Sequence, residues 1–209
     1  MAETTTSLRI VDGYRLEKPR RDALMPGGVL RDREGRMRQL PRYFYEIESW
    51  DAALQYELAP HFHLWEFIQT DVRESAALRF FPRYVPCAVL LTAAMLERFR
   101  EVVGEPVRIA ANGGYRSPQH ELTSHASTHC WASAVNIYRI GDEYLDTRDR
   151  IERYAEIARD VLPGAWIRPA GEDRGFSDDH LHLDFGYLVA VPNDAPGDPF
   201  NPKLEGDPL

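Results

Sequence analysis

The sequence has few cysteines and no long apolar segment. Only Cys87 and Cys130 occur in 209 residues, too few for the disulfide framework of a small secreted domain. We therefore expect both thiols to be reduced. No run of eighteen apolar residues is present, which excludes a transmembrane helix. The second of these absences favours a protein with no membrane partner.

An excess of basic residues is also absent. The formal net charge is -8, which argues against a nucleic-acid partner because such proteins present a basic face. The first seven residues lack a basic segment followed by an apolar one, so we see no secretory signal and expect a cytoplasmic protein. Arginines gather between Arg15 and Arg42, but acids are interleaved with them. We interpret this stretch as a solvated face rather than a basic patch.

The remaining composition is that of an ordinary globular protein, with 44% hydrophobic and 28% charged residues. The length suits one domain, with or without appendages. We divide the chain into an N-terminal extension over 1–57, a main domain over 58–190 and a proline-rich tail over 191–209. Within the extension, Gly28 to Leu40 reads as a hairpin that turns at Gly35.

Hydrophobic periodicity predicts the elements of the main domain. A helix is expected from Pro86 to Val103 with a stop at Gly104, because apolar residues recur there at steps of three and four. Shorter patterns predict helices over 49–55 and from 146 or 147 to 162, and strands over 107–111, 133–138, 165–167 and 181–187. Some connections are too short for parallel crossovers. We therefore expect an α+β fold, with a mostly antiparallel sheet that carries a metal site on one face and helices on the other.

Two histidines in the last of these strands point to chemistry. His180 and His182 are two residues apart, so their side chains share one face of a strand, and Asp184 shares it too. Apolar Leu181 and Leu183 face the other way. A metal ion or a proton-transfer site would explain this pattern, and ordinary surface polarity is the alternative.

A second group of histidines, His120, His125 and His129, follows a Tyr-Arg-Ser turn. Together the motifs resemble the zinc D-Ala-D-Ala carboxypeptidases and dipeptidases, whose fold is shared by the hedgehog signalling domain. The matching segments are Tyr115-Arg116-Ser117, then Ser127-x-His129 with Ala134, then Asp179-His180-Leu181-His182. The resemblance covers roughly residues 59–187 and implies a hedgehog/DD-peptidase-like fold.

The resemblance also implies roles for single residues. His129 and His182 would bind zinc, Asp179 would be the general base, and His180 with Arg116 would stabilise the oxyanion. The site residues expected on this basis are, for catalysis, Asp179, His180 and Arg116; for substrate binding, Ser127 and Tyr115; and for the metal, His129, His182 and Asn136. The partner would be a small peptide or another small molecule that contains an amide.

The sequence departs from the family pattern at two positions. Ala132 replaces a glycine, which is a mild change, and Asn136 replaces the aspartate that supplies the third zinc ligand. Asparagine offers only a neutral amide oxygen. His125 or His180 could serve as the third ligand instead, and a three-histidine site would suit zinc but also copper or iron.

Three functions stay open on these grounds. The first is a metal-dependent hydrolase of an amide or peptide bond with an altered metal site, and we favour it because the Asp179-His180-x-His182 motif and Arg116 are intact. The second is a repurposed relative that runs other metal-dependent chemistry on a small molecule. The third is an inactive binding module. Fold alone does not choose between them. We further expect Cys130 and Trp131 to be buried, Asp184 to orient His182, and His120 to lie on the surface.

Overall fold

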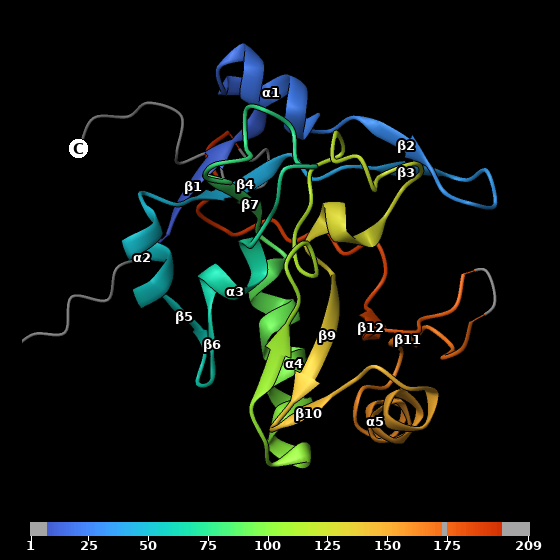
Figure 1. Ribbon diagram of the computed structural model, residues 1–209. Helices are drawn as coiled ribbons and strands as arrows, with labels where there is room; N and C mark the ends of the chain where they lie inside the picture. Colours follow the sequence, from blue (N-terminus) through green and yellow to red (C-terminus); the bar gives the residue numbers. More distant parts are fainter. Residues whose placement is uncertain (1–7, 173–174, 198–209) are drawn as a thin grey trace, which may run out of the picture.

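The computed structural model describes residues 8–172 and 175–197 (Figure 1). The named strand pairs within these residues are all antiparallel, so the expectation of an α+β protein with mostly antiparallel sheets is confirmed. The elements in chain order are β1 (Arg9–Asp12), η1 (Gly13–Arg15), α1 (Lys18–Leu24), β2 (Val29–Arg31), β3 (Met37–Gln39), β4 (Tyr43–Glu46), α2 (Trp50–Gln55), β5 (Glu57–Ala59), β6 (Phe62–His63), α3 (Leu64–Ile68), β7 (Tyr84–Pro86), α4 (Val89–Val103), β8 (Val107–Ile109), η2 (Thr128–Trp131), β9 (Ala134–Ile140), β10 (Glu143–Tyr144), α5 (Arg148–Val161), β11 (Trp166–Ile167) and β12 (Leu181–Asp184).

The largest sheet places β9 between β8 and β12, with β11 beyond β12 and β10 folded back on the end of β9. Its two faces differ in chemistry because side chains alternate along each strand. Val135, Ile137, Leu181 and Leu183 are fully buried in the core. Asn136 lies opposite His182 in the register of β9 and β12, so this polar pair shares the other face.

Helices α4 and α5 pack against each other and against the apolar side of this sheet. Figure 1 shows α4 running alongside β9. Helix α4 begins three residues later than the pattern predicted, because Tyr84–Pro86 forms strand β7 with β4. It ends as predicted at Gly104, which has a φ of 75° and donates its N–H to the Arg100 carbonyl. Thr147 is the N-cap residue of α5.

The N-terminal extension is joined to the rest of the chain. Strand β4 pairs with β7 in a three-stranded sheet, so backbone pairing crosses the expected boundary at residue 57. The predicted hairpin forms as β2 and β3. Inside its turn, Asp32 accepts hydrogen bonds from Arg36 and Arg38. Burial acts to raise the pKa of Asp32, but these bonds outweigh it and lower the pKa to about 2.

Several single-residue expectations have clear outcomes. Cys130 and Trp131 are buried, as predicted. His120 is also buried, so its expected surface position is wrong: its Nε2 lies 3.0 Å from the Asn112 amide oxygen, and its Nδ1 accepts the N–H of Leu122. Of the expected tail, residues 198–209 lie outside the described residues, whereas Ala195 is buried. No helix in the described part of the chain is long and apolar enough to cross a membrane.

Candidate functional site

Three of the predicted metal-site residues converge on the polar face of the large sheet. His182 on β12 and Asn136 on β9 are directly opposite in register, and His182 Nδ1 lies 2.7 Å from Asn136 Oδ1. His129, in the η2 helix that leads into β9, places its ring centroid 5.3 Å from that of His182. The structure therefore brings together residues that are up to 53 positions apart in sequence.

The His129 ring is held in a form that suits metal binding. Its Nδ1 donates a proton to the Gly114 carbonyl oxygen at 2.7 Å, which leaves the Nε2 lone pair free. That Nε2 atom is buried and has no hydrogen-bond partner. Burial, together with the positive charge of Arg116, holds the pKa of His129 well below its usual range. The imidazole is therefore neutral and able to ligate an ion.

His182 is neutral for the same reasons. Its side chain is almost completely buried. Burial lowers the pKa of His182 to about 4, and Arg168 contributes to the shift. Asp184, expected to orient this ring, is at 3.8 Å from His182 Nε2 and accepts a hydrogen bond from the Thr128 hydroxyl at 2.8 Å. The carboxylate therefore lies beside the ring but is anchored elsewhere.

The site differs from a typical zinc centre in its third metal ligand. No group of three His, Cys, Asp or Glu side chains among the described residues is arranged to hold a metal ion, and Asn136 contributes a neutral amide where the family pattern has a carboxylate. Both ring nitrogens of His125 already have partners: its Nε2 accepts a hydrogen bond from Arg33 at 3.1 Å, and its Nδ1 is 3.0 Å from the Ser124 hydroxyl. The residues present fit a transition metal through two imidazoles and one neutral oxygen, a weaker set than one containing a carboxylate.

Asp179 and His180 form a pair at the edge of the site. Asp179 is 78% exposed, and its carboxylate contacts His180 Nδ1. The opposite ring atom, His180 Nε2, is buried and without a partner. Burial lowers the pKa of His180, while the hydrogen bond to Asp179 acts in the other direction. The pair thus links a solvated carboxylate to an imidazole nitrogen inside the protein.

The Tyr-Arg-Ser turn is fixed by a buried carboxylate. Glu74 accepts hydrogen bonds from the Ser117 N–H at 3.0 Å and from the Ser117 hydroxyl at 2.5 Å. Arg116 is mostly buried and its Nε atom has no partner. Burial lowers the pKa of Arg116 to about 10. Tyr115, expected to bind substrate, is buried, and its hydroxyl has no hydrogen-bond partner.

A cleft of about 450 Å³ opens beside His182. Ser127, expected to bind substrate, lines it together with residues that the motifs did not indicate: Arg33, Thr128, Trp166, Arg168 and Asp184 among them. The ring of Trp166 packs edge-on against His182 with centroids 5.7 Å apart. Arg168 follows strand β11 directly, and its position in an unremarkable segment gave no sequence signal. Of the histidine pair, His182 lines this cleft and His129 does not.

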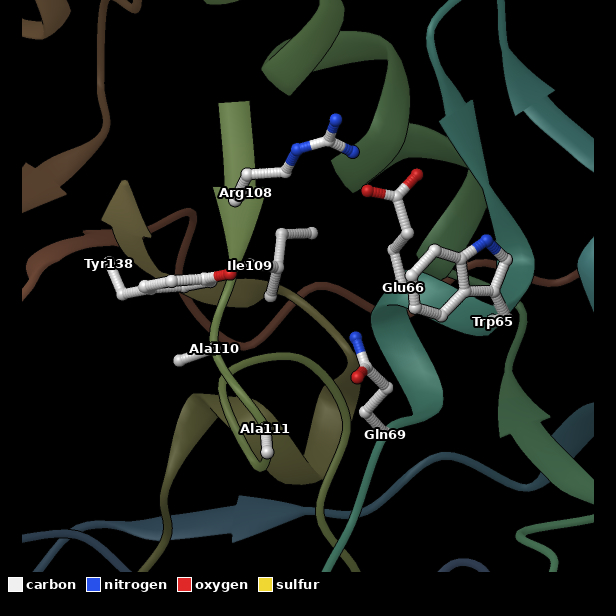
Figure 2. Close-up of a pocket in the computed structure, with 8 residues that line it drawn as sticks. All are labelled: Trp65, Glu66, Gln69, Arg108, Ile109, Ala110, Ala111 and Tyr138. Carbon is white, nitrogen blue, oxygen red and sulfur yellow. The ribbon is translucent and has the colours of Figure 1, made fainter. Parts of the chain in front are cut away.

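A second cleft of about 430 Å³ lies between α3 and β8 (Figure 2). Figure 2 shows the Glu66 carboxylate and the Arg108 guanidinium on facing walls, with Trp65, Gln69 and Tyr138 around them. None of the residues predicted from the motifs lines it. Two of them, Ser127 and His182, line the cleft beside β12.

No protein-family model, curated protein or solved structure matches the chain. Any assignment of function rests on the motifs and on the geometry of this site.

Proposed function

We propose that the protein is a metal-dependent hydrolase that cleaves an amide or peptide bond, with a hedgehog/DD-peptidase-like fold and a metal site altered at Asn136. The observation that carries the proposal is the buried, unpartnered Nε2 of His129 beside the His182 ring. An orphaned buried nitrogen costs free energy unless something binds it. A divalent transition metal, zinc or else copper or iron, would satisfy it and would supply Lewis-acid chemistry for hydrolysis.

The surrounding side chains supply the remaining roles. The Asp179–His180 pair takes up a proton at His180 Nε2, and the Asp179 carboxylate stabilises the imidazolium that results. The Arg116 guanidinium has no carboxylate within ion-pair distance among the described residues, so its charge is available to stabilise an oxyanion. Ser127 lies in the wall of the cleft, where its hydroxyl can bind the substrate.

The proposal is tested by metal content. We expect wild-type protein, loaded with zinc and then desalted, to retain the ion, and His129→Ala and His182→Ala each to lose it, because either change leaves only one imidazole. His61→Ala is a matched control, since His61 pairs with Glu97 away from this site. Elemental analysis gives the stoichiometry. Retention of metal by either site variant would refute the assignment of ligands.

One observation favours a second candidate function, an inactive binding module. The His182 ring already has a hydrogen-bond partner in Asn136 at 2.7 Å, so this half of the site is satisfied without an ion. A repurposed enzyme would bind a metal, as the hydrolase would, but would catalyse a different reaction. Wild-type protein that binds neither zinc, copper nor ferrous iron would favour the binding module over both enzymes.

A further inference from the structure

We propose that the β2–β3 hairpin is part of the substrate site, and that Arg33 from this hairpin, together with Arg168, binds an anionic group of the substrate, either a carboxylate or a phosphate. The inference rests on the proposed function in that it places the substrate in the cleft beside His182. It assigns a role to a segment outside the part of the chain that resembles the peptidase family.

The hairpin is docked against the site rather than free in solution. The Arg31 carbonyl accepts the backbone N–H of Ala126 at 2.7 Å, next to His125. The Gln39 carbonyl accepts the indole N–H of Trp131 at 2.9 Å. In Figure 1 the hairpin projects above the segment that joins β11 to β12. These contacts hold the turn of the hairpin at the rim of the cleft.

Arg33 and Arg168 both line the cleft, and neither forms an ion pair in the described part of the chain. Other arginines of the hairpin behave differently: Arg36 pairs with Asp32 and with Glu34. Arg33 is also exposed, as the interpretation of a solvated face predicts, but its Nε donates to an uncharged partner, His125.

The acidic residues of the cleft compensate these two charges only in part: the charge of Asp184 favours the Arg168 cation, but the two side chains form no ion pair among the described residues. Asp184 accepts hydrogen bonds from the Thr128 hydroxyl and from the Gly186 N–H, and Glu34 is paired with Arg36. The pKa of Arg168 is lowered by burial and by the charge of Arg33, so the two guanidiniums repel each other across the cleft. The Nε atom of Arg168 is buried without a partner.

Arg168 is partly buried and Arg33 lies at the exposed side of the same cleft, so the like charge of Arg33 adds to the cost of burying the Arg168 cation. An anion between them removes the repulsion and supplies acceptors for the unused guanidinium donors, which bind carboxylate and phosphate in a fork geometry. The cleft volume suits a small molecule or the end of a peptide. The geometry therefore favours a substrate with an anionic group a short distance from the bond that is cleaved.

The experiment measures anion binding to the full chain after removal of metal with a chelator, so that no ion can bind the probe. Three probes are titrated by calorimetry: inorganic phosphate, a blocked dipeptide with a free carboxyl group, and the same dipeptide capped as an amide. We expect the free dipeptide or phosphate to bind and the amide to bind at least roughly tenfold more weakly, the scale of a charged hydrogen bond. Tight binding of the dipeptide identifies a carboxylate ligand, and tight binding of phosphate identifies a phosphate ligand.

Substitution of each arginine tests whether these two side chains bind the anion. Arg33→Gln and Arg168→Gln should each weaken the preferred probe by roughly 10- to 100-fold. Arg98→Gln, an exposed position on α4, changes the net charge by the same amount and should have less than about a twofold effect. Circular dichroism checks that each variant is folded.

The inference is overturned if wild type binds neither anion, if the amide binds as well as the free dipeptide, or if both arginine variants bind like wild type. Because the titrations use metal-free protein, they are independent of the metal-content test. Loss of the metal assignment with anion binding intact would leave this inference standing.

Discussion

Restoring a carboxylate at position 136 is the most direct perturbation of the metal site. In Asn136→Asp the amide oxygen, 2.7 Å from His182 Nδ1, becomes an anion. Changing a residue that only supports a metal ligand costs roughly 10- to 100-fold in affinity. A residue that ligates directly should matter at least as much, so we expect zinc affinity to rise by roughly 100-fold or more.

One effect opposes this gain, and the structure limits its size. The new carboxylate would raise the pKa of His182, and a protonated imidazole cannot bind metal. An adjacent opposite charge typically raises a histidine pKa by about 1–3 units. Starting from about 4, the ring would remain mostly neutral at pH 7.5. Proton competition would then reduce the gain by less than a factor of about two.

The assay is competitive titration of wild type and variant with zinc, copper and ferrous iron. Asn136→Ala removes the oxygen without adding charge, and Gln69→Glu adds the same charge in the separate cleft of Figure 2. Only Asn136→Asp should tighten zinc, and hydrolysis of D-Ala-D-Ala-like amides could then be sought in that variant. Unchanged affinity for all three ions would refute the placement of Asn136 at the metal, and with it this part of the motif alignment.

Three further predictions follow from the same geometry. Asp179→Asn should keep the metal and the fold but lower turnover by roughly 10²- to 10⁴-fold, measured with any substrate found; loss of metal instead would make Asp179 a ligand. In metal-free protein, His182 has a folded pKa of about 4 against about 6.5 unfolded, so the unfolded state binds the proton first. Stability should be full above pH 6.5 and fall by about 3 kcal/mol towards pH 4, a loss that urea titrations should find reduced in His182→Asn. Glu74→Ala should lower the free energy of unfolding by about 1–3 kcal/mol, because it leaves the buried N–H and hydroxyl of Ser117 unpaired; an unchanged urea midpoint would contradict this.

Periodicity and turn residues were sufficient to predict the two long helices, α4 and α5, and four strands of the large sheet, β8, β9, β11 and β12. Helix α4 follows from the spacing of Val89, Ala93, Leu96 and Phe99, all buried, and its end follows from the positive φ that Gly104 accepts. The polar face of β12 follows from alternation, since His182 is opposite Asn136 while Leu181 and Leu183 enter the core. Local sequence patterns were therefore sufficient to predict β9 and β12, the two strands of the site.

Features that depend on contacts between residues distant in sequence could not be predicted from local patterns, for a physical reason. Nothing in the neighbourhood of His120 signals its burial, because its partner Asn112 is a turn residue whose position depends on the fold. Arg33 and Arg168 are 135 positions apart, and only the docking of the hairpin on the site brings them to one cleft. Two arginines so far apart in sequence cannot be recognised as neighbours from the sequence, whereas a motif of adjacent residues can.

The amide at position 136 and the unpaired arginines both make the charge of the site more positive than it would be with an aspartate at position 136. An aspartate would have placed a negative charge beside the histidine pair, whereas Asn136 places none, and the charges of Arg116 and Arg168 both act to lower histidine pKa values there. A cation bound at this position would keep its full charge and meet two guanidiniums nearby. The same environment favours an anion. Binding of the metal and binding of the substrate would then favour each other. An anionic substrate would supply the negative charge that an aspartate at position 136 would carry and that Asn136 lacks.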